Sequence, residues 1–276
     1  MEQELRDKYE RLLEIFRGMG SAGVAFSGGV DSTLMLCAAS EALGDKAAAI
    51  TACSPSFPAR ERREAGAFCG ERGIRQIEFV SDELDDPAYA ANPANRCYIC
   101  KKRLFSRMQQ IARENGLSCL AEGSNLDDEG DYRPGMQAIR ELGIRSPLRE
   151  AGLYKSEIRA LSKEMGLPTW DKQSYACLAS RVPYGETISR GKLRMIEQAE
   201  EYLSGMDFRQ LRVRLHGEGL ARIEVLPEEM GKVMENREEI ARALRSFGFM
   251  YITIDLQGYR TGSMNEMIGV KEGKGL

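Results

Sequence analysis

The chain has 276 residues, of which 42% are hydrophobic and 29% charged, enough to bury one large or two modest cores. Its net charge of −3 excludes a dedicated nucleic-acid binder with a broad basic surface. No apolar run reaches membrane-spanning length, and the chain starts with a charged amphipathic stretch rather than a signal peptide, so a cytoplasmic protein is expected. In that reducing compartment, its seven cysteines are expected to be thiols, metal ligands or catalysts.

Strand and helix patterns alternate through the first two thirds of the chain. An amphipathic helix over residues 1–19 is followed by apolar strand patterns at 23–26, 47–52, 74–80 and 117–122. Helical patterns lie at 32–43, 58–72, 98–114 and 155–166, and long polar loops at 81–96, 123–135 and 171–190. Apolar strands separated by helices predict an α/β fold with a parallel sheet covered on both faces.

The first strand pattern ends in VAFSGGVDST, residues 24–33. A strand, a glycine turn and a helix N-terminus form an anion cradle, because bare backbone N–H groups and the helix dipole both favour an oxyanion there. The candidate ligands are Ser27, Gly28, Gly29, Asp31, Ser32 and Thr33. Asp31 alone would repel a phosphate, so Mg²⁺ is expected between them. The alternative is an ordinary strand-to-helix turn capped by Ser or Asp.

The turn lacks the lysine of the common GxxxxGKS/T loop. It resembles SGGxDS, the pyrophosphate loop of the ATP pyrophosphatases (PP-loop enzymes), which split ATP between the α and β phosphates and attach AMP to a substrate oxygen. Ligands of parallel sheets sit at the carboxyl ends of the strands. Further ATP contacts are therefore expected in the loops after the second and fourth strands, at Ser54, Gly123, Asn125 and Asp128. For the acidic residues the alternative is a turn rich in Asx residues.

Cys97 and Cys100 form a CxxC pair at the start of a helical pattern. Two thiolates at this spacing can share a metal or cluster, or form a redox pair. Cys177 is a third candidate ligand, and three cysteines can hold a 4Fe–4S cluster with one iron open. The alternative is an incidental helical pair and a small buried hydrophobe. The other four cysteines, at 37, 53, 69 and 119, fall in core patterns.

The pattern changes after residue 190, so two domains are expected, 1–190 and 191–276. A helix at 191–204, strands at 209–215, 219–225 and 250–256, and a helix at 228–246 predict a small α+β domain with an antiparallel sheet. In its first strand, period two puts Arg212 and Arg214 on one face. Arginine suits phosphate or carboxylate, although a solvated sheet face would show the same pattern.

Four segments together resemble the LarE family of ATP-dependent sulfur transferases. They are SGGVDST, EGSNLDDEGDYRPG (122–135), CLASRVPYG (177–185) and RVRLHGEGLARIE (212–224). The resemblance covers about residues 20 to 265. It implies that ATP adenylates a carboxylate of pyridinium-3,5-biscarboxylic acid mononucleotide, after which sulfur displaces AMP to give a thiocarboxylate.

The resemblance also implies residue roles. Some family members sacrifice the sulfur of the cysteine matching Cys177, which becomes dehydroalanine, whereas others carry three cysteines and a 4Fe–4S cluster. The CxxC pair at 97 and 100 departs from the single-cysteine pattern and favours the cluster. Substrate contacts fall on Arg181, Glu200, Arg212, Arg214 and Glu224. A homo-oligomer is expected.

Two alternatives share the ATP loop. A tRNA-thiolating enzyme would use the same cysteines but should carry a basic surface or zinc-binding cysteine pairs, and neither is evident. An ammonia-dependent amidotransferase or synthetase would not need the three cysteines. The expected partners are therefore ATP and a small mononucleotide, without nucleic acid or membrane.

Overall fold

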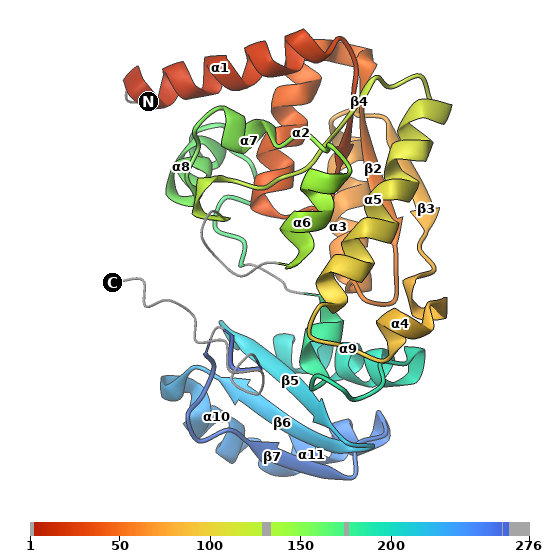
Figure 1. Ribbon diagram of the computed structural model, residues 1–276. Helices are drawn as coiled ribbons and strands as arrows, with labels where there is room; N and C mark the ends of the chain where they lie inside the picture. Colours follow the sequence, from red (N-terminus) through yellow and green to blue (C-terminus); the bar gives the residue numbers. More distant parts are fainter. Residues whose placement is uncertain (1–2, 129–133, 174–176, 261, 265–276) are drawn as a thin grey trace. The chain divides into compact units, whose positions relative to one another are not determined.

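The computed structural model describes residues 3–128, 134–173, 177–260 and 262–264 (Figure 1). The chain divides into two compact units. The first unit comprises Met1–Glu83 and Cys97–Tyr175, and the second comprises Leu84–Arg96 and Ala176–Leu276. Over the described ranges, every helix is too short or too polar to cross a membrane.

The first unit is built on a parallel sheet of four strands. They are β1 (Ala22–Ala25), β2 (Ala47–Cys53), β3 (Gln76–Val80) and β4 (Cys119–Ala121). The strand order is β3-β2-β1-β4, and every pairing is parallel. The predicted α/β fold is confirmed, and the central position of β1 brings its carboxyl end beside those of β2 and β4.

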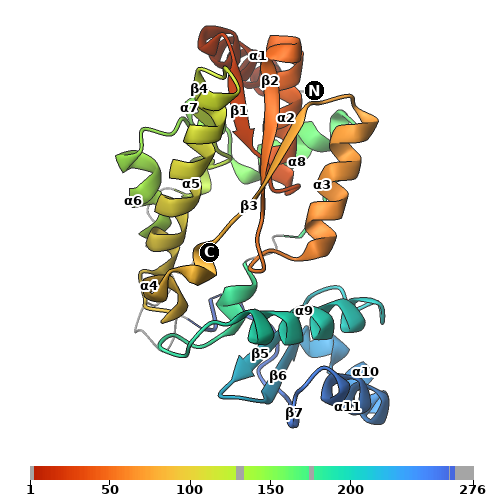
Figure 2. The same ribbon diagram turned by 90° about the vertical axis from the view of Figure 1, so that its right-hand side faces the viewer.

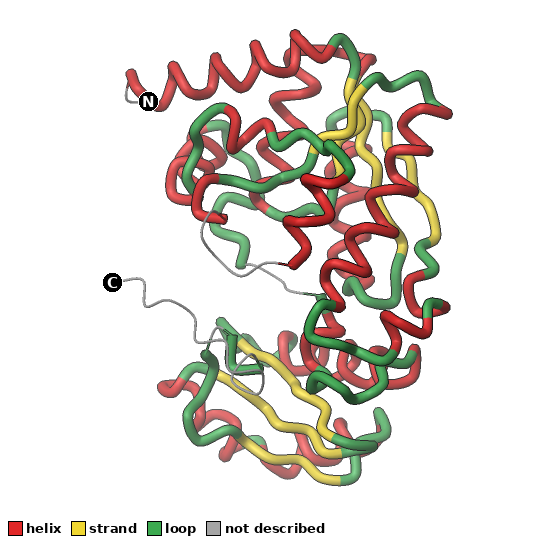
Figure 3. The backbone as a smooth tube through the Cα atoms, viewed as in Figure 1, coloured by secondary structure: helices red, strands yellow, loops and turns green. Residues whose placement is uncertain are grey.

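Helices cover both faces of this sheet, and their alternation with the strands is visible in Figure 3. They are α1 (Gln3–Met19), α2 (Val30–Leu43), α3 (Ala59–Glu71), α5 (Arg96–Glu114), α6 (Pro134–Glu141), α7 (Pro147–Glu150) and α8 (Lys155–Glu164). Figure 2 shows α3 on one side of the sheet and α5 on the other. The short helices α6 and α7 were not predicted, because eight and four residues are too few to establish a helical period.

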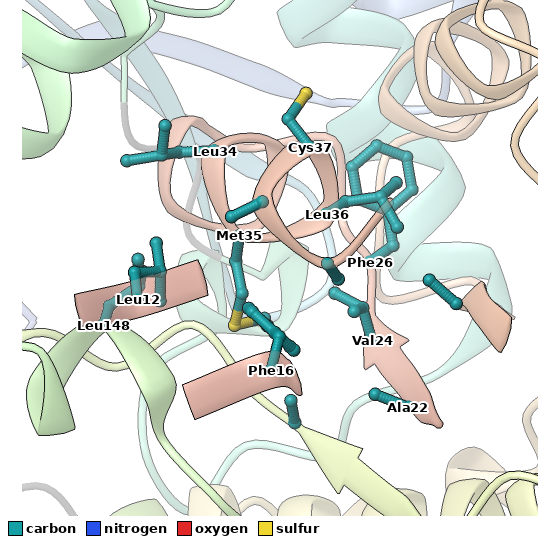
Figure 4. Packing of buried hydrophobic residues seen from close by; sticks show 14 of the residues in the cluster. Leu12, Phe16, Ala22, Val24, Phe26, Leu34, Met35, Leu36, Cys37 and Leu148 are labelled. Atoms are coloured by element: carbon teal, nitrogen blue, oxygen red, sulfur yellow. The ribbon is translucent and has the colours of Figure 1, made fainter. Parts of the chain in front are cut away.

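Helix α2 is buried on almost every side. Its residues Leu34, Met35 and Leu36 are fully buried, and they pack against Leu12 of α1 and Val24 of β1 in one core cluster (Figure 4). A helix that is apolar all round belongs inside a core. The glycine turn before α2 is therefore fixed at both ends, by β1 and by the buried helix.

The second unit contains a mixed sheet of three strands. Its elements are α4 (Pro87–Ala90), α9 (Arg190–Ser204), β5 (Leu211–His216), β6 (Leu220–Val225), α10 (Met230–Glu235), α11 (Arg237–Ser246) and β7 (Tyr251–Ile254). Strands β5 and β6 form the expected antiparallel hairpin, but β7 pairs with β6 in parallel. The prediction of a purely antiparallel sheet is thus wrong, because the two helices between β6 and β7 make a crossover that returns the chain in the same direction.

The division into units differs from the boundary suggested by composition, between residues 190 and 191. Residues 84–96 belong to the second unit because they bond to the segment after Cys177. The Asn92 side-chain amide donates to the backbone carbonyls of Val182 and Pro183, at 3.2 and 2.7 Å. The Arg96 guanidinium lies 4.5 Å from the centre of the Tyr184 ring.

Candidate active site

The glycine turn of the first unit has the geometry of an anion-binding loop. Gly28 has a φ of +71°, and a Cβ at this position would lie 3.3 Å from the Cβ of Ala65, so only glycine fits. Gly29 caps α2 in an extended conformation, and no side chain caps this helix. The alternative of an ordinary Ser or Asp cap therefore does not apply, and the N-terminal N–H groups of α2 are suited to an anionic ligand.

The hydroxyl residues of the loop have different surroundings. The Ser32 hydroxyl lies 3.1 Å from that of Ser27 and donates to the Gly29 carbonyl at 3.2 Å. Thr33 is fully buried, and its hydroxyl has no hydrogen-bond partner among the described residues. Thr33 also lines a cavity of about 490 Å³ beside the loop, together with residues of α3 and of the segment 168–173. An ATP contact for these three side chains stays a prediction.

Asp31 joins the loop after β4 to the glycine turn. Its carboxylate accepts from the Asn125 side-chain amide at 3.2 Å and from the Lys155 ammonium at 2.5 Å. The backbone N–H of Asn125 donates to the Asp128 carboxylate at 3.0 Å. Gly123 lies against the same residue, since a Cβ there would be 3.3 Å from the Cβ of Asp31.

The structure thus brings together four residues that the sequence predicted from two distant loops. The Lys155 ammonium pairs with the Asp31 carboxylate, and carboxylate oxygens are ligands that suit Mg²⁺. The Asn125 amide presents its nitrogen to Asp31, while its oxygen accepts from the backbone N–H of Asp127 at 2.9 Å. Sequence reasoning missed Lys155, because a lysine in a polar segment 124 residues away from its partner carries no pattern.

Ser54, the predicted ATP contact after β2, is held by a buried carboxylate. Its hydroxyl donates to Glu83, which is 2% exposed and also accepts from the Ser81 hydroxyl at 2.5 Å. The Ser54 hydroxyl in turn accepts from the backbone N–H of Ser56 at 2.8 Å. Ser54 is therefore oriented at the carboxyl end of β2, and its contact with ATP stays a prediction.

The three candidate cysteines are divided between the two units. Cys97 is exposed and Cys100 half-buried, three residues apart at the start of α5 and therefore on one face of that helix. Cys177 is half-buried and belongs to the second unit. Across the described residues, no three His, Cys, Asp or Glu side chains are grouped so as to hold a metal ion. A cluster on the three cysteines therefore stays a prediction.

Of the four cysteines expected in the core, two are buried there, whereas Cys53 and Cys119 are half-buried. Cys37 and Cys69 are buried in the cluster that surrounds α2 and α3. Burial raises the pKa of each thiol to about 11. Thiols of this kind are poor nucleophiles and poor metal ligands at neutral pH.

In the second unit, a buried ion pair connects Cys177 to the sheet. Arg181 is fully buried and donates to both carboxylate oxygens of Glu200, each at 2.9 Å. The same guanidinium donates to the backbone carbonyl of Cys177 at 3.2 Å. Glu200 also accepts from the backbone N–H of Val213 at 2.9 Å. One carboxylate of α9 therefore fixes both the cysteine loop and β5.

The two arginines of β5 are buried as well. Arg212 and Arg214 are each 5% exposed, so the alternative of a solvated sheet face is wrong. Arg214 donates to Glu224 of β6 at 2.7 Å and to the Ser180 carbonyl at 3.2 Å. Its Nε is buried and has no hydrogen-bond partner in the part of the chain that is described.

The five predicted substrate residues therefore form one buried cluster. Arg181 pairs with Glu200 and Arg214 with Glu224, and the Arg212 guanidinium lies 5.2 Å from the centre of the Tyr259 ring. Burial lowers the pKa of Arg212, and the neighbouring charge of Arg181 lowers it further. Burial also lowers the pKa of Arg181, but the attraction of the Glu200 carboxylate is larger, so the pKa of Arg181 is raised overall. The excess of buried positive charge suits an anionic ligand, such as a phosphate or a carboxylate.

Comparison with known proteins found relatives along nearly the whole chain. An uncharacterised protein of Synechocystis is 42% identical over 96% of this chain and 99% of the relative. The pyridinium-3,5-bisthiocarboxylic acid mononucleotide synthase of Lactiplantibacillus plantarum is 37% identical over 96% of each chain. One subunit of the glutamine-hydrolysing GMP synthase of Methanosphaerula palustris is 25% identical over 52% of this chain and 50% of the relative. No family model matches the chain.

The similarity to GMP synthase supports a nucleotide-binding domain of the ATP pyrophosphatase type, but it covers only about half of each protein. The similarity to the bisthiocarboxylic acid synthase extends over both units and is stronger. The chain therefore belongs to the LarE family of ATP-dependent sulfur transferases.

Proposed function

We propose that this protein adenylates a carboxylate of pyridinium-3,5-biscarboxylic acid mononucleotide and converts it to a thiocarboxylate. The name of the Lactiplantibacillus plantarum relative supports this product. The observation that carries the proposal is the buried arginine cluster of the second unit, which Arg181 joins to the backbone of Cys177. Guanidiniums that can bind an anionic mononucleotide are thereby connected to a thiol that can take part in sulfur transfer.

In the first step, a substrate carboxylate oxygen attacks the α-phosphorus of ATP. The bond from this phosphorus to the bridging oxygen breaks, pyrophosphate leaves with the electron pair, and an acyl adenylate forms. The uncapped N-terminus of α2 would stabilise the departing charge through its N–H groups. Mg²⁺ would neutralise pyrophosphate when bound, and the Asp31 carboxylate, which Asn125 orients, would hold it.

In the second step, a sulfur nucleophile attacks the carbonyl carbon of the adenylate. The bond from carbon to the AMP oxygen breaks, AMP leaves with the electron pair, and the sulfur loses its proton to solvent. Activation is needed because an unmodified carboxylate would have to expel oxide. Cys97, Cys100 and Cys177 would hold a 4Fe–4S cluster, which supplies sulfide when bound.

The single-cysteine route differs in its sulfur source. There, the Cys177 thiolate would attack the adenylate and form a thioester. Loss of the Cys177 α-proton and cleavage of its Cβ–S bond would then release the thiocarboxylate and leave dehydroalanine. The two routes consume different sulfur atoms, so the mass of the protein after one turnover separates them.

The test uses anaerobically purified protein with ATP, the biscarboxylic acid mononucleotide and sulfide. We expect release of AMP and pyrophosphate that depends on the mononucleotide, and a product in which sulfur has replaced oxygen. Cys97→Ser, Cys100→Ser and Cys177→Ser should each lower bound iron and sulfur transfer, while Cys119→Ser, the control, should not. A Cys177 converted to dehydroalanine in iron-free protein would exclude the cluster.

The same assay addresses the alternatives. Turnover that requires tRNA, or that requires ammonia and is unaffected by loss of the three cysteines, would contradict the proposal. Assembly into a homo-oligomer belongs to the proposal and is measured by light scattering of the eluted protein.

A further inference from the structure

Lys172 is a second lysine at the glycine turn, and its ammonium has three close acceptors. It donates to the backbone carbonyl of Gly28 at 3.0 Å and to the Glu64 carboxylate at 2.8 Å, and it lies 2.7 Å from the Glu61 carboxylate. An ammonium has three N–H donors, so these contacts satisfy it completely. The side chains of Lys172 and Glu61 are each only 14% exposed, so water screens this pair weakly.

The contact with Gly28 acts on the orientation of one peptide group. In a planar trans peptide, the carbonyl of one residue and the N–H of the next point in opposite directions. Fixing the Gly28 carbonyl toward Lys172 therefore directs the Gly29 N–H away from α3. Gly29 is the N-cap of α2, and its N–H makes a long contact, 3.4 Å, with the Ser27 hydroxyl, which an anionic ligand at this helix end could replace.

The backbone that carries Lys172 is itself anchored. Arg159 of α8 donates to the backbone carbonyls of Trp170 and Lys172, at 2.8 and 2.9 Å. The ammonium of Lys163, also on α8, lies 4.6 Å from the centre of the Trp170 ring. Lys172 is thus held on one side by α8 and on the other by the two carboxylates of α3.

Packing alone does not hold the turn in place on this side. The cavity of about 490 Å³ lies between α3 and the segment 168–173, and Gly28, Glu61 and Lys172 all line it. Gly28 packs against Ala65 of α3, but the glycine also borders this space. The polar contact with Lys172 is the described interaction that fixes the Gly28 carbonyl on the cavity side.

We propose that Lys172 is a positioning residue for adenylation, because it orients the Gly28–Gly29 peptide so that the Gly29 N–H faces the pyrophosphate part of ATP. Glu61 and Glu64 of α3 hold the ammonium in this position. This inference rests on the proposed role of residues 27–33 as the pyrophosphate loop.

The test compares Lys172→Met with Lys46→Met, which removes the same charge from an exposed lysine just before β2. Calorimetry measures binding of ATP, pyrophosphate and AMP to each full-length variant with Mg²⁺ present. Lys172→Met should lower the affinity for ATP and for pyrophosphate by roughly tenfold or more, because a small displacement of the Gly29 N–H is enough to weaken such a contact. Its affinity for AMP should stay close to that of the unmodified protein, and Lys46→Met should leave the affinities for all three ligands unchanged.

The double variant Glu61→Gln, Glu64→Gln keeps Lys172 but removes the two carboxylates that hold its ammonium. It should therefore also lower the affinity for ATP. If Lys172→Met loses affinity for ATP and AMP equally, or if it binds ATP with unchanged affinity, the positioning role is wrong. If Lys172→Met does not fold, the double variant decides by the same criterion. If Asp31→Ala leaves ATP binding unchanged, the proposed pyrophosphate loop itself is wrong. A wrong loop and a wrong role for Lys172 are therefore distinguished by different variants.

Discussion

Glu200→Gln tests the buried charge cluster most directly, because it removes one charge and almost no volume. The carboxylate of Glu200 is the described partner of both ends of the fully buried Arg181 guanidinium fork, and it also accepts from the Val213 backbone N–H. Glutamine keeps one oxygen for the backbone contact. The guanidinium remains buried and charged, with its main counter-charge removed.

Removing one partner of a buried ion pair typically costs about 3–5 kcal/mol. Glutamine retains an acceptor, so we expect about 3 kcal/mol for Glu200→Gln. Removing both charges costs less, because the uncompensated guanidinium is gone. The double variant Arg181→Met, Glu200→Gln should therefore be more stable than Glu200→Gln alone, by at least about 1 kcal/mol.

Urea unfolding followed by far-ultraviolet circular dichroism measures these free energies. The only tryptophan, Trp170, belongs to the first unit, so its fluorescence is an internal control that should change little. The double variant should fold and still bind the mononucleotide weakly, since it lacks one substrate arginine. Equal or greater destabilisation of the double variant would refute the account of an uncompensated charge.

Three further outcomes are expected. Asp31→Ala should abolish ATP-dependent pyrophosphate release while circular dichroism stays unchanged, because its carboxylate is not needed for the turn itself; normal release would count against the magnesium site. Arg214→Ala should weaken the mononucleotide by at least about 2 kcal/mol and ATP much less, since a buried charged contact is lost only at the substrate cluster; equal loss of both ligands would contradict that assignment. The hydrogen bond from Tyr98 is the main reason why the pKa of Glu141 is lowered to about 2, with Lys102 and Gln137 contributing. Because this pKa is lowered, the stabilisation from Glu141 is present above its ordinary pKa of 4.5 and is lost as the pH falls toward 2. Tyr98→Phe should raise this pKa toward 4.5, which a carboxylate titration by nuclear magnetic resonance would detect; an unchanged value would mean that the hydrogen bond is not formed.

Much of the first unit could be predicted from local patterns. The four strands, the glycine turn and the long helices each have a period or a motif in consecutive residues. The meeting of Asp31 with Asn125 followed from one rule, that parallel strands present their carboxyl ends at one edge.

The remainder depends on contacts that no local pattern reveals. Arginines alternating along β5 look the same whether their face is solvated or covered, so only the structure distinguishes the two cases. Lys155 and Lys172 reach the glycine turn from 124 and 144 residues away. Strand β7 pairs in parallel with β6 because the helices before it cross over the sheet. The periodicity of those helices does not reveal whether they make such a crossover.

The way the chain is divided between the two units bears on how the protein folds during synthesis. Strands β1 to β4 are complete at residue 121, so the first sheet can pair early. Residues 84–96 emerge before then, but Asn92 bonds to a carbonyl 90 residues further along the chain. At about 5–20 residues per second, this segment waits roughly five to twenty seconds for its partner. Tyr89 of this segment is buried in the folded protein, so during that interval it has to be protected from aggregation. A fragment of residues 191–276 would lack the segment 84–96 entirely.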